Sequence, residues 1–404
     1  MSRIGLDNPE TDPSIDESPF ADLPEPLILP VPTMLDNFQT VNILAPLVRC
    51  SKLPFRHLCS LYETHVNTTP MILAEEFSRS QIARTSDFST STDERGVYWM
   101  EPRYSAVSSG SSIHPEDRVS KSYHVSPAHT RLPPTAEAPT KHSVLVRGAL
   151  IAQFASPNGK SLADAAELIS PYVDGLDLNC GCPQKWAYNE GIGCALLRKP
   201  ELVRDMVRTV KDRMGWNWPV SIKIRVDPDL QNTDTLVKSA LQAGVSHITI
   251  HGRTRHQAST EPVDLEAIKF AVECARGEVP TVANGDLWDL EDARKMRETG
   301  VKGVMAARGL LANPALFAGY DKTPQHAVEQ FVNVSLDYGF IFPLFHRHLA
   351  YMLESHFSRA EKTWFNSLSS TVSTVDYLAS RGIDFSSSRS TIWDARRGRT
   401  VLRI

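Results

Sequence analysis

The sequence predicts an α/β protein in which a (β/α)8 TIM barrel precedes a C-terminal helical domain. Eight short apolar runs alternate with amphipathic helical stretches. Alternation of strands and helices implies parallel strand pairing, and eight such units can close into a barrel. No G-x-G-x-x-G follows the first run, so a doubly wound open sheet lacks its usual signature. The 404 residues are enough for a barrel of roughly 250 residues with a smaller addition.

The expected elements follow one another along residues 39–320, the predicted barrel domain. Strands are expected at Val41–Pro46, Val66–Ile72, Ala149–Ala155, Gly175–Cys180, Val220–Val226, His247–Gly252, Thr281–Gly285 and Gly303–Gly309. Helices are expected at Leu162–Ile169, Pro200–Met214, Thr233–Ala243, Leu265–Ala275 and Leu290–Thr299. Beyond Pro314 only helices are expected, near residues 324–338, 343–357 and 360–380, and they form a domain over residues 321–383.

Three segments do not follow this rhythm. Residues 1–38 are rich in Pro, Asp and Glu and show no periodicity, which predicts a disordered acidic arm. Residues 87–143 are rich in Ser, Pro and Thr, which predicts a long flexible low-complexity insertion without a core of its own. Residues 384–404 form a tail to which we assign no role.

Composition narrows the cellular setting. There is no apolar run of 18 residues, so no membrane partner is expected, and the acidic N-terminus resembles neither a signal nor a transit peptide. We therefore expect a cytoplasmic protein, with the nucleus as a further location, and six reduced cysteines. The net charge is −4, but residues 341–404 hold nine Lys and Arg against five Asp and Glu. This local excess indicates either a polyanion partner or a solvated helical face.

Polar residues recur where the expected strands end. In a barrel of this kind, reactive groups lie at the carboxyl ends of the strands. One polar residue after one strand is weak evidence, because most such residues are structural. Six strands with polar ends indicate a shared site. The residues are Gln153, Asn179, Cys182, Lys223, Arg225, His251, Asn284, Asp286 and Arg308.

The last two strand ends suggest a phosphate site. Gly285 and Gly309 permit a close backbone approach, and Arg308 adds positive charge. Loops after the seventh and eighth strands of such barrels commonly bind phosphate. A pair of tight strand-to-helix turns explains the same spacing equally well.

Cys182 is the candidate proton donor. Cys180-x-Cys182 with Cys194 does not predict a metal, because zinc cysteines usually stand two to four residues apart and four ligands are needed. A thiol with an ordinary pKa of about 8.5 keeps its proton near neutral pH and can act as a general acid. The alternative is a buried structural cysteine.

Several motifs in the same order resemble the tRNA-dihydrouridine synthase family. They span residues 41–86 and roughly 146–383, and the resemblance is greatest to the branch that modifies positions 20a and 20b. The motifs that carry the family resemblance are Ile43-Leu-Ala-Pro-Leu-Val48, Thr69-Pro-Met-Ile72, Leu178-Asn-Cys-Gly-Cys-Pro-Gln184, Ser221-Ile-Lys-Ile-Arg225, His251-Gly-Arg-Thr254 and Ala283-Asn-Gly-Asp286. The resemblance to the branch rests on further motifs, among them Gln184-Lys-Trp-Ala187, Arg255-His-Gln257 and Phe365-Asn-Ser-Leu-Ser369.

The resemblance implies a flavin enzyme that reduces a uridine in the D-loop of tRNA to 5,6-dihydrouridine. NAD(P)H would reduce FMN, hydride would pass to C6 of uracil, and Cys182 would protonate C5. The protein would act as a monomer, and the basic helical domain would bind tRNA. Asn179 and Arg225 would orient the uracil. The cofactor-binding residues implied are Pro46, Leu47, Val48, Gln153, Lys223, His251, Asn284, Gly285, Asp286, Ala307 and Arg308.

Two other functions fit parts of the sequence. Lys223 inside a barrel could be the Schiff-base lysine of a phosphate-binding lyase, provided that Arg225 on the same strand face lowers its pKa. A catalytically impaired tRNA-binding paralogue would keep the fold without the chemistry. The flavin distinguishes the first alternative, and Cys182 distinguishes the second.

Overall fold

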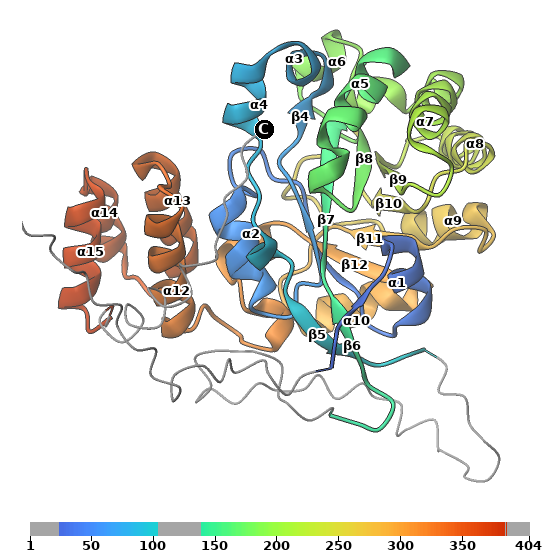
Figure 1. Ribbon diagram of the computed structural model, residues 1–404. Helices are drawn as coiled ribbons and strands as arrows, with labels where there is room; N and C mark the ends of the chain where they lie inside the picture. The colour runs from blue at the N-terminus through green and yellow to red at the C-terminus, as the bar shows by residue number, and fades with distance from the viewer. Residues whose placement is uncertain (1–23, 104–138, 384, 386–404) are drawn as a thin grey trace, which may run out of the picture.

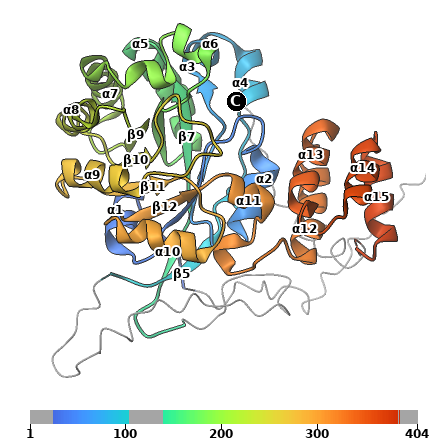
Figure 2. The same cartoon turned by 180° about the vertical axis from the view of Figure 1, so that it is seen from behind.

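The computed structural model describes residues 24–103, 139–383 and 385. The remaining parts of the predicted arm, insertion and tail lie outside the described residues. Figures 1 and 2 show a barrel of parallel strands surrounded by helices, with four C-terminal helices on one side. The predicted TIM barrel with a C-terminal helical region is therefore confirmed.

The barrel strands pair in parallel in the order β3-β2-β12-β11-β10-β9-β8-β7-β4, and the pairing of β3 with β7 closes the ring. The expected second strand is interrupted at Pro70, which lacks the N–H that a strand ladder needs. Its two parts, β3 and β4, both pair with β7. The strands are β2 (Asn42–Leu44), β3 (Val66–Thr68), β4 (Ile72–Leu73), β7 (Ala149–Ala155), β8 (Gly175–Cys180), β9 (Val220–Arg225), β10 (Ile248–His251), β11 (Thr281–Asn284) and β12 (Gly303–Ala306).

Helices cover the outside of the ring, and their amphipathic pattern explains their placement. The apolar residues of strands and helices form one continuous core between the two layers. Helix starts are often capped, as at Asn158 and Asp264, whose side chains accept backbone N–H bonds. The helices are α2 (Leu53–Ser60), α3 (Ala74–Arg79), α4 (Gln81–Asp87), α5 (Gly159–Ile169), α6 (Lys185–Asn189), α7 (Pro200–Met214), α8 (Leu230–Gln242), α9 (Leu265–Ala275), α10 (Leu290–Glu298) and α11 (Arg308–Ala312).

The inside of the barrel is apolar toward the amino ends of the strands. Val66, Ile151, Val282 and Met305 belong to one buried cluster there. The same cluster includes residues of α1 (Val31–Asn37), β5 (Val97–Met100) and β6 (Val144–Arg147), which close this end of the barrel. A short strand β1 (Leu27–Ile28) pairs with β6. Ligand access is therefore left to the opposite end, where the polar residues lie.

Ordered structure extends into two segments that we predicted to be disordered. Helix α1 lies within the predicted arm, and its Met34 is fully buried. The predicted insertion likewise contributes β5 and a 3-10 turn at Thr92–Glu94, with Glu94 fully buried. The polar composition of these two segments did not indicate their contacts with the barrel, because only a few apolar residues in each segment cover the barrel end.

The C-terminal helices are α12 (Gln325–Asp337), α13 (Phe342–Leu353), α14 (Arg359–Ser367) and α15 (Thr371–Ser380). The single helix expected near residues 360–380 is in fact two helices. Ser370 ends the run, because its side chain accepts a hydrogen bond from the Ser373 N–H and so starts α15. No helix in the described part of the chain is long and apolar enough to cross a membrane.

The C-terminal helices pack on the barrel through α12, which lies against α2 (Figure 1). Aromatic and histidine rings make part of this contact. The His348 ring stacks on Phe55 with 4.5 Å between centroids. His57 Nδ1 lies 2.9 Å from the Tyr338 hydroxyl. Burial, with a smaller effect of Arg347, lowers the pKa of His348 to about 3. His348 is therefore neutral in the folded protein at every physiological pH.

This buried histidine predicts acid sensitivity of the folded state. The pKa of His348 is lower in the folded chain than its ordinary 6.5, so the unfolded chain binds more protons below that pH. Stability from this group is complete above pH 6.5 and is lost as the pH falls. The wild type should lose unfolding free energy between pH 7 and pH 5. We expect His348→Leu to lose about 2 kcal/mol less over the same interval, because it lacks the buried imidazole. Urea unfolding at both pH values measures it.

The matched control is His142→Leu, because His142 is exposed. Its unfolding free energy should follow the wild-type pH dependence. Equal pH dependence of the His348 and His142 variants would contradict the prediction.

Candidate active site

Polar side chains line the barrel interior toward the carboxyl ends of β7–β11. Because side chains alternate along a strand, residues two apart share a face. Gln153, Asp177, Lys223 and Asn284 are on the inward face, while their neighbours join the outer core. The predicted strand-end residues therefore come together on one side of the sheet, above the apolar plug.

The side chains of Asp177, Gln153 and Asn179 form a hydrogen-bonded chain. Gln153 Nε2 donates to Asp177 Oδ2 at 2.8 Å, and Asn179 Nδ2 donates to Gln153 Oε1 at 2.8 Å. Asp177 Oδ1 also accepts from the Ser221 hydroxyl at 2.7 Å. All four residues are buried, so the network fixes their orientations.

Asn179 connects this network to the thiol loop. Its Oδ1 accepts from the backbone N–H groups of Gly181 at 3.1 Å and Cys182 at 2.9 Å. We predicted that Asn179 orients substrate. The structure shows that its amide oxygen positions the Cys182 loop, and one Nδ2 hydrogen remains that could meet a substrate.

Cys182 and Cys180 lie on different sides of the strand end. Cys180 is fully buried in the core between strands and helices. Cys182 is half-buried and packs against Ala187 and Ile192. A Cβ on Gly193 would lie 2.8 Å from Cys182 Cβ, so this position requires glycine. Among the described residues, no group of three His, Cys, Asp or Glu side chains could hold a metal.

Lys223 is a half-buried cation inside the barrel mouth. Its Nζ donates to Asn284 Oδ1 at 2.7 Å, and Asn284 Nδ2 donates to the Met305 carbonyl at 2.8 Å. Burial lowers the pKa of Lys223, and Arg225 lowers it further, whereas Asp177 raises it. Burial also raises the pKa of Asp177. The site therefore holds a lysine that is easier to deprotonate than usual and has one hydrogen-bond partner among the described residues.

His251 is neutral at this mouth. Burial and the nearby cations, Lys223 first among them, lower its pKa to about 2. Arg253 Nη1 lies 3.3 Å from His251 Nε2. A guanidinium can only donate, so Nε2 accepts and Nδ1 carries the proton. His251 thus offers an N–H donor without adding charge.

Asp286, which follows β11, orders the basic residues after β10 and β12. Its two oxygens accept from Arg253 and, at 2.7 Å, from Arg308. Arg308 also donates to the Ser259 carbonyl at 2.9 Å, and its Cζ lies 5.2 Å from the Trp288 ring centroid. Two guanidinium groups on one carboxylate leave a net positive charge, which suits an anionic group.

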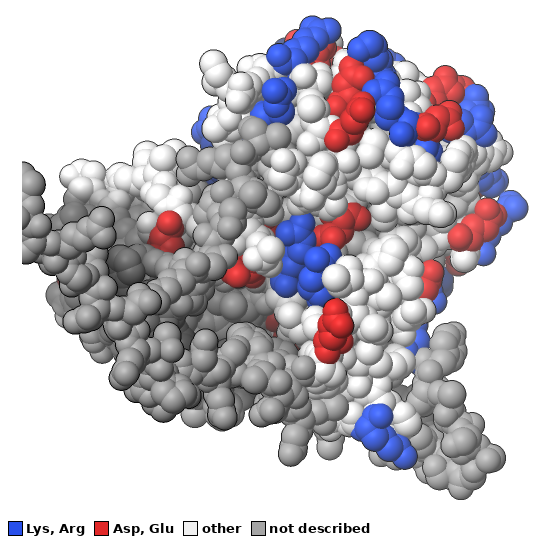
Figure 3. Space-filling view, in the orientation of Figure 1, with Lys and Arg blue, Asp and Glu red and all other residues white. Residues whose placement is uncertain are grey.

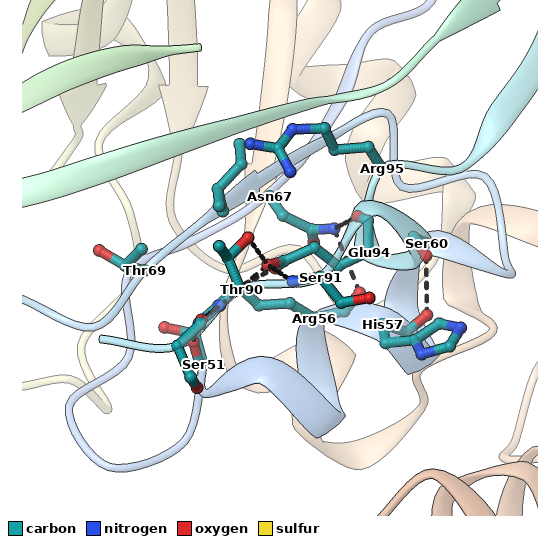
Figure 4. Close-up of polar contacts among 12 residues, drawn as sticks. Ser51, Arg56, His57, Ser60, Asn67, Thr69, Thr90, Ser91, Glu94 and Arg95 are labelled. Atoms are coloured by element: carbon teal, nitrogen blue, oxygen red, sulfur yellow. Dashed lines mark hydrogen bonds and ion pairs between the residues drawn. The ribbon is translucent and has the colours of Figure 1, made fainter. Parts of the chain in front are cut away.

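A buried ion pair supports the chain directly after the loop Pro46–Val48. Figure 4 shows the residues of this support, Ser51, Arg56, Thr90 and Glu94. The Leu47 N–H donates to Ser51 Oγ at 2.9 Å. Arg56 donates to the Ser51 carbonyl at 2.7 Å and forms an ion pair with Glu94. Thr90 donates to the same carboxylate at 2.6 Å. The ordered start of the predicted insertion therefore supports a loop at the barrel mouth, while Val48 itself is exposed.

Sequence reasoning missed part of this arrangement. Asp177 is central to the network, and period-two alternation with Asn179 could have indicated it. Arg253 could have been found within the His251-Gly-Arg253 motif. Arg56 and Glu94 left no signal, because they meet only in the folded chain. Ala307 is the residue before the first residue of α11. This position fits a cofactor-binding residue and an ordinary strand-to-helix turn equally well.

Comparison with known proteins gives the family. Residues 122–374 match the model of the family described as Dihydrouridine synthase (Dus). A mouse protein, "tRNA-dihydrouridine(20a/20b) synthase [NAD(P)+]-like", is 41% identical over 362 residues, covering 88% of this chain and 94% of its own. The chain belongs to the dihydrouridine synthase family.

Two further relatives of this Dus chain have related names. A human protein with the same name as the mouse one is 40% identical and covers 85% of this chain and 92% of its own. The "tRNA-dihydrouridine(20a/20b) synthase [NAD(P)+]" of Schizosaccharomyces pombe is 38% identical, with 80% and 82% covered. The family resemblance inferred from the motifs is therefore confirmed.

The buried ion pair predicts a large stability effect in this Dus chain. Glu94→Gln keeps the side-chain shape but leaves the Arg56 cation buried without its counter-charge. Breaking such a pair costs about 3–5 kcal/mol of unfolding free energy, and urea unfolding measures it. The control is Glu291→Gln, which removes an exposed pair with Arg294 and should leave the unfolding free energy close to that of the wild type, because solvent screens the pair. Equal losses in the two variants would contradict a special role of the buried pair.

Proposed function

We propose that this chain is a tRNA-dihydrouridine synthase that reduces uridine to 5,6-dihydrouridine at positions 20a and 20b of the tRNA D-loop. FMN would be its cofactor and NAD(P)H its reductant. The observation that carries the proposal is that Asn179 joins the Cys182 loop to the buried network of Gln153 and Asp177 beside Lys223. The network thus fixes a proton donor, the Cys182 thiol, and a cation, Lys223, at the same end of the barrel.

The residues at the mouth suit a flavin with a phosphate tail. Lys223 is half-buried and has one hydrogen-bond partner among the described residues, so an anionic ring edge would complete its pairing. Gln153 and His251 would hold the same ring, and Pro46, Leu47 and Val48 would support it. The positive charge around Asp286 and Arg308 suits a phosphate, together with Asn284, Gly285 and Ala307. The chemistry that FMN supplies when bound is hydride transfer from NAD(P)H to C6 of uracil.

The chain's own residues account for the proton and for orientation. Cys182 would donate its thiol proton to C5, and Asn179 keeps the thiol loop in place through two backbone N–H groups. Arg225 donates to the carbonyls of Gly181 and Thr254, which leaves Nη2 to orient the uracil. Fixed donors of this kind lower the barrier because they need not reorganise during the reaction.

Access to the mouth requires extrusion of the uridine from the folded RNA, and loop nucleotides are the ones that a protein can splay out. We propose that residues 321–383 bind tRNA outside the barrel. Of the nine Lys and Arg after residue 340, five lie at residues 389–403, outside the described residues. In the described part, Lys362 and Arg381 pair with acidic residues. In Figure 3, interspersed basic and acidic side chains are visible over the barrel.

We propose further that the protein acts as a monomer in the cytoplasm or the nucleus. Neither location requires a membrane partner, and the proposed tRNA substrate is present in both compartments.

The flavin is the first test, because the rival lyase needs none. The lowered pKa of Lys223 favours a Schiff-base amine as well as a flavin partner. We expect the purified protein to be yellow and to show the visible absorbance of an oxidised flavin, or to acquire it when FMN is added. A protein that stays colourless with FMN, and that is inactivated by borohydride together with a carbonyl substrate, would support the lyase instead.

Cys182→Ala is the second test. We expect dihydrouridine formation to fall by about 10²–10⁴-fold, because the general acid is lost, while tRNA binding is unchanged. Mass spectrometry of digested tRNA measures the product. The control is Cys274→Ala, which removes a thiol on α9 outside the barrel mouth and should keep wild-type turnover. Unchanged turnover in the Cys182 variant would remove this thiol from the mechanism and favour no catalytic role for it.

A further inference from the structure

Two loops meet at the barrel rim beside the proposed proton donor. Arg225 Nε donates to the Gly181 carbonyl at 3.1 Å, and its Nη1 donates to the Thr254 carbonyl at 2.7 Å. Each of these carbonyls belongs to the residue directly before a rim residue, Cys182 in one loop and Arg255 in the other. Arg225 therefore clamps the two loops together and fixes Arg255 near the thiol loop.

Arg255 stacks on an aromatic ring across this gap. Its Cζ lies 3.3 Å from the centroid of the Tyr188 ring, the separation of two planes in contact. Such a contact holds a guanidinium over the ring face by electrostatic attraction to the π electrons. Tyr188 is on α6 and is 41% exposed. The stack is thus preformed and open to solvent.

Helix α6 contacts the thiol loop with one side and carries the stack on its exposed side. Ala187 on its buried side packs with Ile192 against Cys182. Trp186 and Tyr188, on either side of Ala187 in the sequence, are both exposed. The helix therefore rests on the thiol loop and presents aromatic rings at the rim.

The Arg255 guanidinium has no hydrogen bond or ion pair among the residues that the structure describes. Other basic residues near the mouth do: Arg225 holds two carbonyls, and Arg253 and Arg308 hold Asp286. Arg255 is thus a planar cation supported from one side by Tyr188, with its donors unused. This arrangement suits a ligand that has a flat π face and a nearby negative charge.

Resting on the proposed function, we infer that the Tyr188–Arg255 stack is the platform on which the nucleotide next to the target uridine stacks when that uridine is extruded. Extrusion leaves the neighbouring base without its stacking partner. Single-stranded RNA bases stack on aromatic rings and on arginine planes, and a nearby cation attracts the phosphate. Tyr188 and Arg255 are binding residues for substrate in this assignment, distinct from the proton donor.

Steady-state kinetics of the full-length flavin-loaded protein test the platform. We expect Arg255→Ala and Tyr188→Ala each to raise the KM for tRNA by about 10-fold, the size of one lost base-stacking contact, with kcat within about twofold. Tyr188→Phe keeps the ring and should behave as wild type. Arg255→Lys keeps the charge but not the plane, so it should raise the KM while preserving the salt dependence of tRNA binding. The control is Arg208→Ala, on the exposed side of α7.

NAD(P)H also carries a base that could stack here, and flavin reduction distinguishes the two ligands. We expect NAD(P)H to reduce the flavin of all four variants at the wild-type rate. A slowed reduction with unchanged KM for tRNA would overturn the assignment in favour of the dinucleotide. An unchanged KM in both alanine variants would overturn it altogether.

A direct binding probe separates this inference from the proposed function. In tRNA with 2-aminopurine next to the target uridine, stacking on the platform should quench the fluorescence with wild type and not with Arg255→Ala. Quenching by a wild-type protein that forms no dihydrouridine would sink the proposed function and keep the platform. Product formation with no difference in quenching between the two proteins would do the reverse.

Discussion

The hydrogen bonds of one asparagine connect the barrel to its candidate chemistry. Asn179 is buried, donates to Gln153 inside the ring and accepts from two backbone N–H groups of the thiol loop. A buried amide that is satisfied on both sides has one orientation, because any rotation leaves polar groups unpaired. The position of the Cys182 backbone is therefore set by hydrogen bonds to the barrel interior, through Asn179 and Gln153.

That constraint works only because the two halves of the barrel interior differ. One half is filled by apolar residues and sealed by α1 and β5, which keeps water away from the polar half above. Burial there lowers the pKa of His251, and the cations Lys223 and Arg225 lower it further. Burial also makes it costly to keep Lys223 charged. The same cost becomes binding energy for an anionic ligand, since pairing a buried charge offsets its desolvation.

Much of the barrel follows from the sequence because its code is local. β7, β8, α7 and α9 begin and end where the hydrophobic pattern predicts, since strand and helix periods differ and caps mark their ends. The strand-end residues of the site were likewise predictable, because a parallel barrel brings all carboxyl ends to one side. What failed was tertiary in origin. Met34 in α1 and the Arg56–Glu94 pair acquire their roles only from partners distant in the chain.

The site shows the same division between local and tertiary information. Asn179 was found from its motif, but its link to the thiol loop was not, because the residues that bond to its amide group lie on β7 and in the following loop. The stack of Arg255 on Tyr188 joins a residue of one motif that was noticed for resemblance alone with the residue directly after another, Gln184-Lys-Trp-Ala187. Arg225 explains why they meet: it bonds to both loops, so its inward position on β9 determines the spacing of the rim. A substitution at Arg225 would therefore act on the proposed orientation of uracil and on the rim together, whereas one at Arg255 would act on the rim alone.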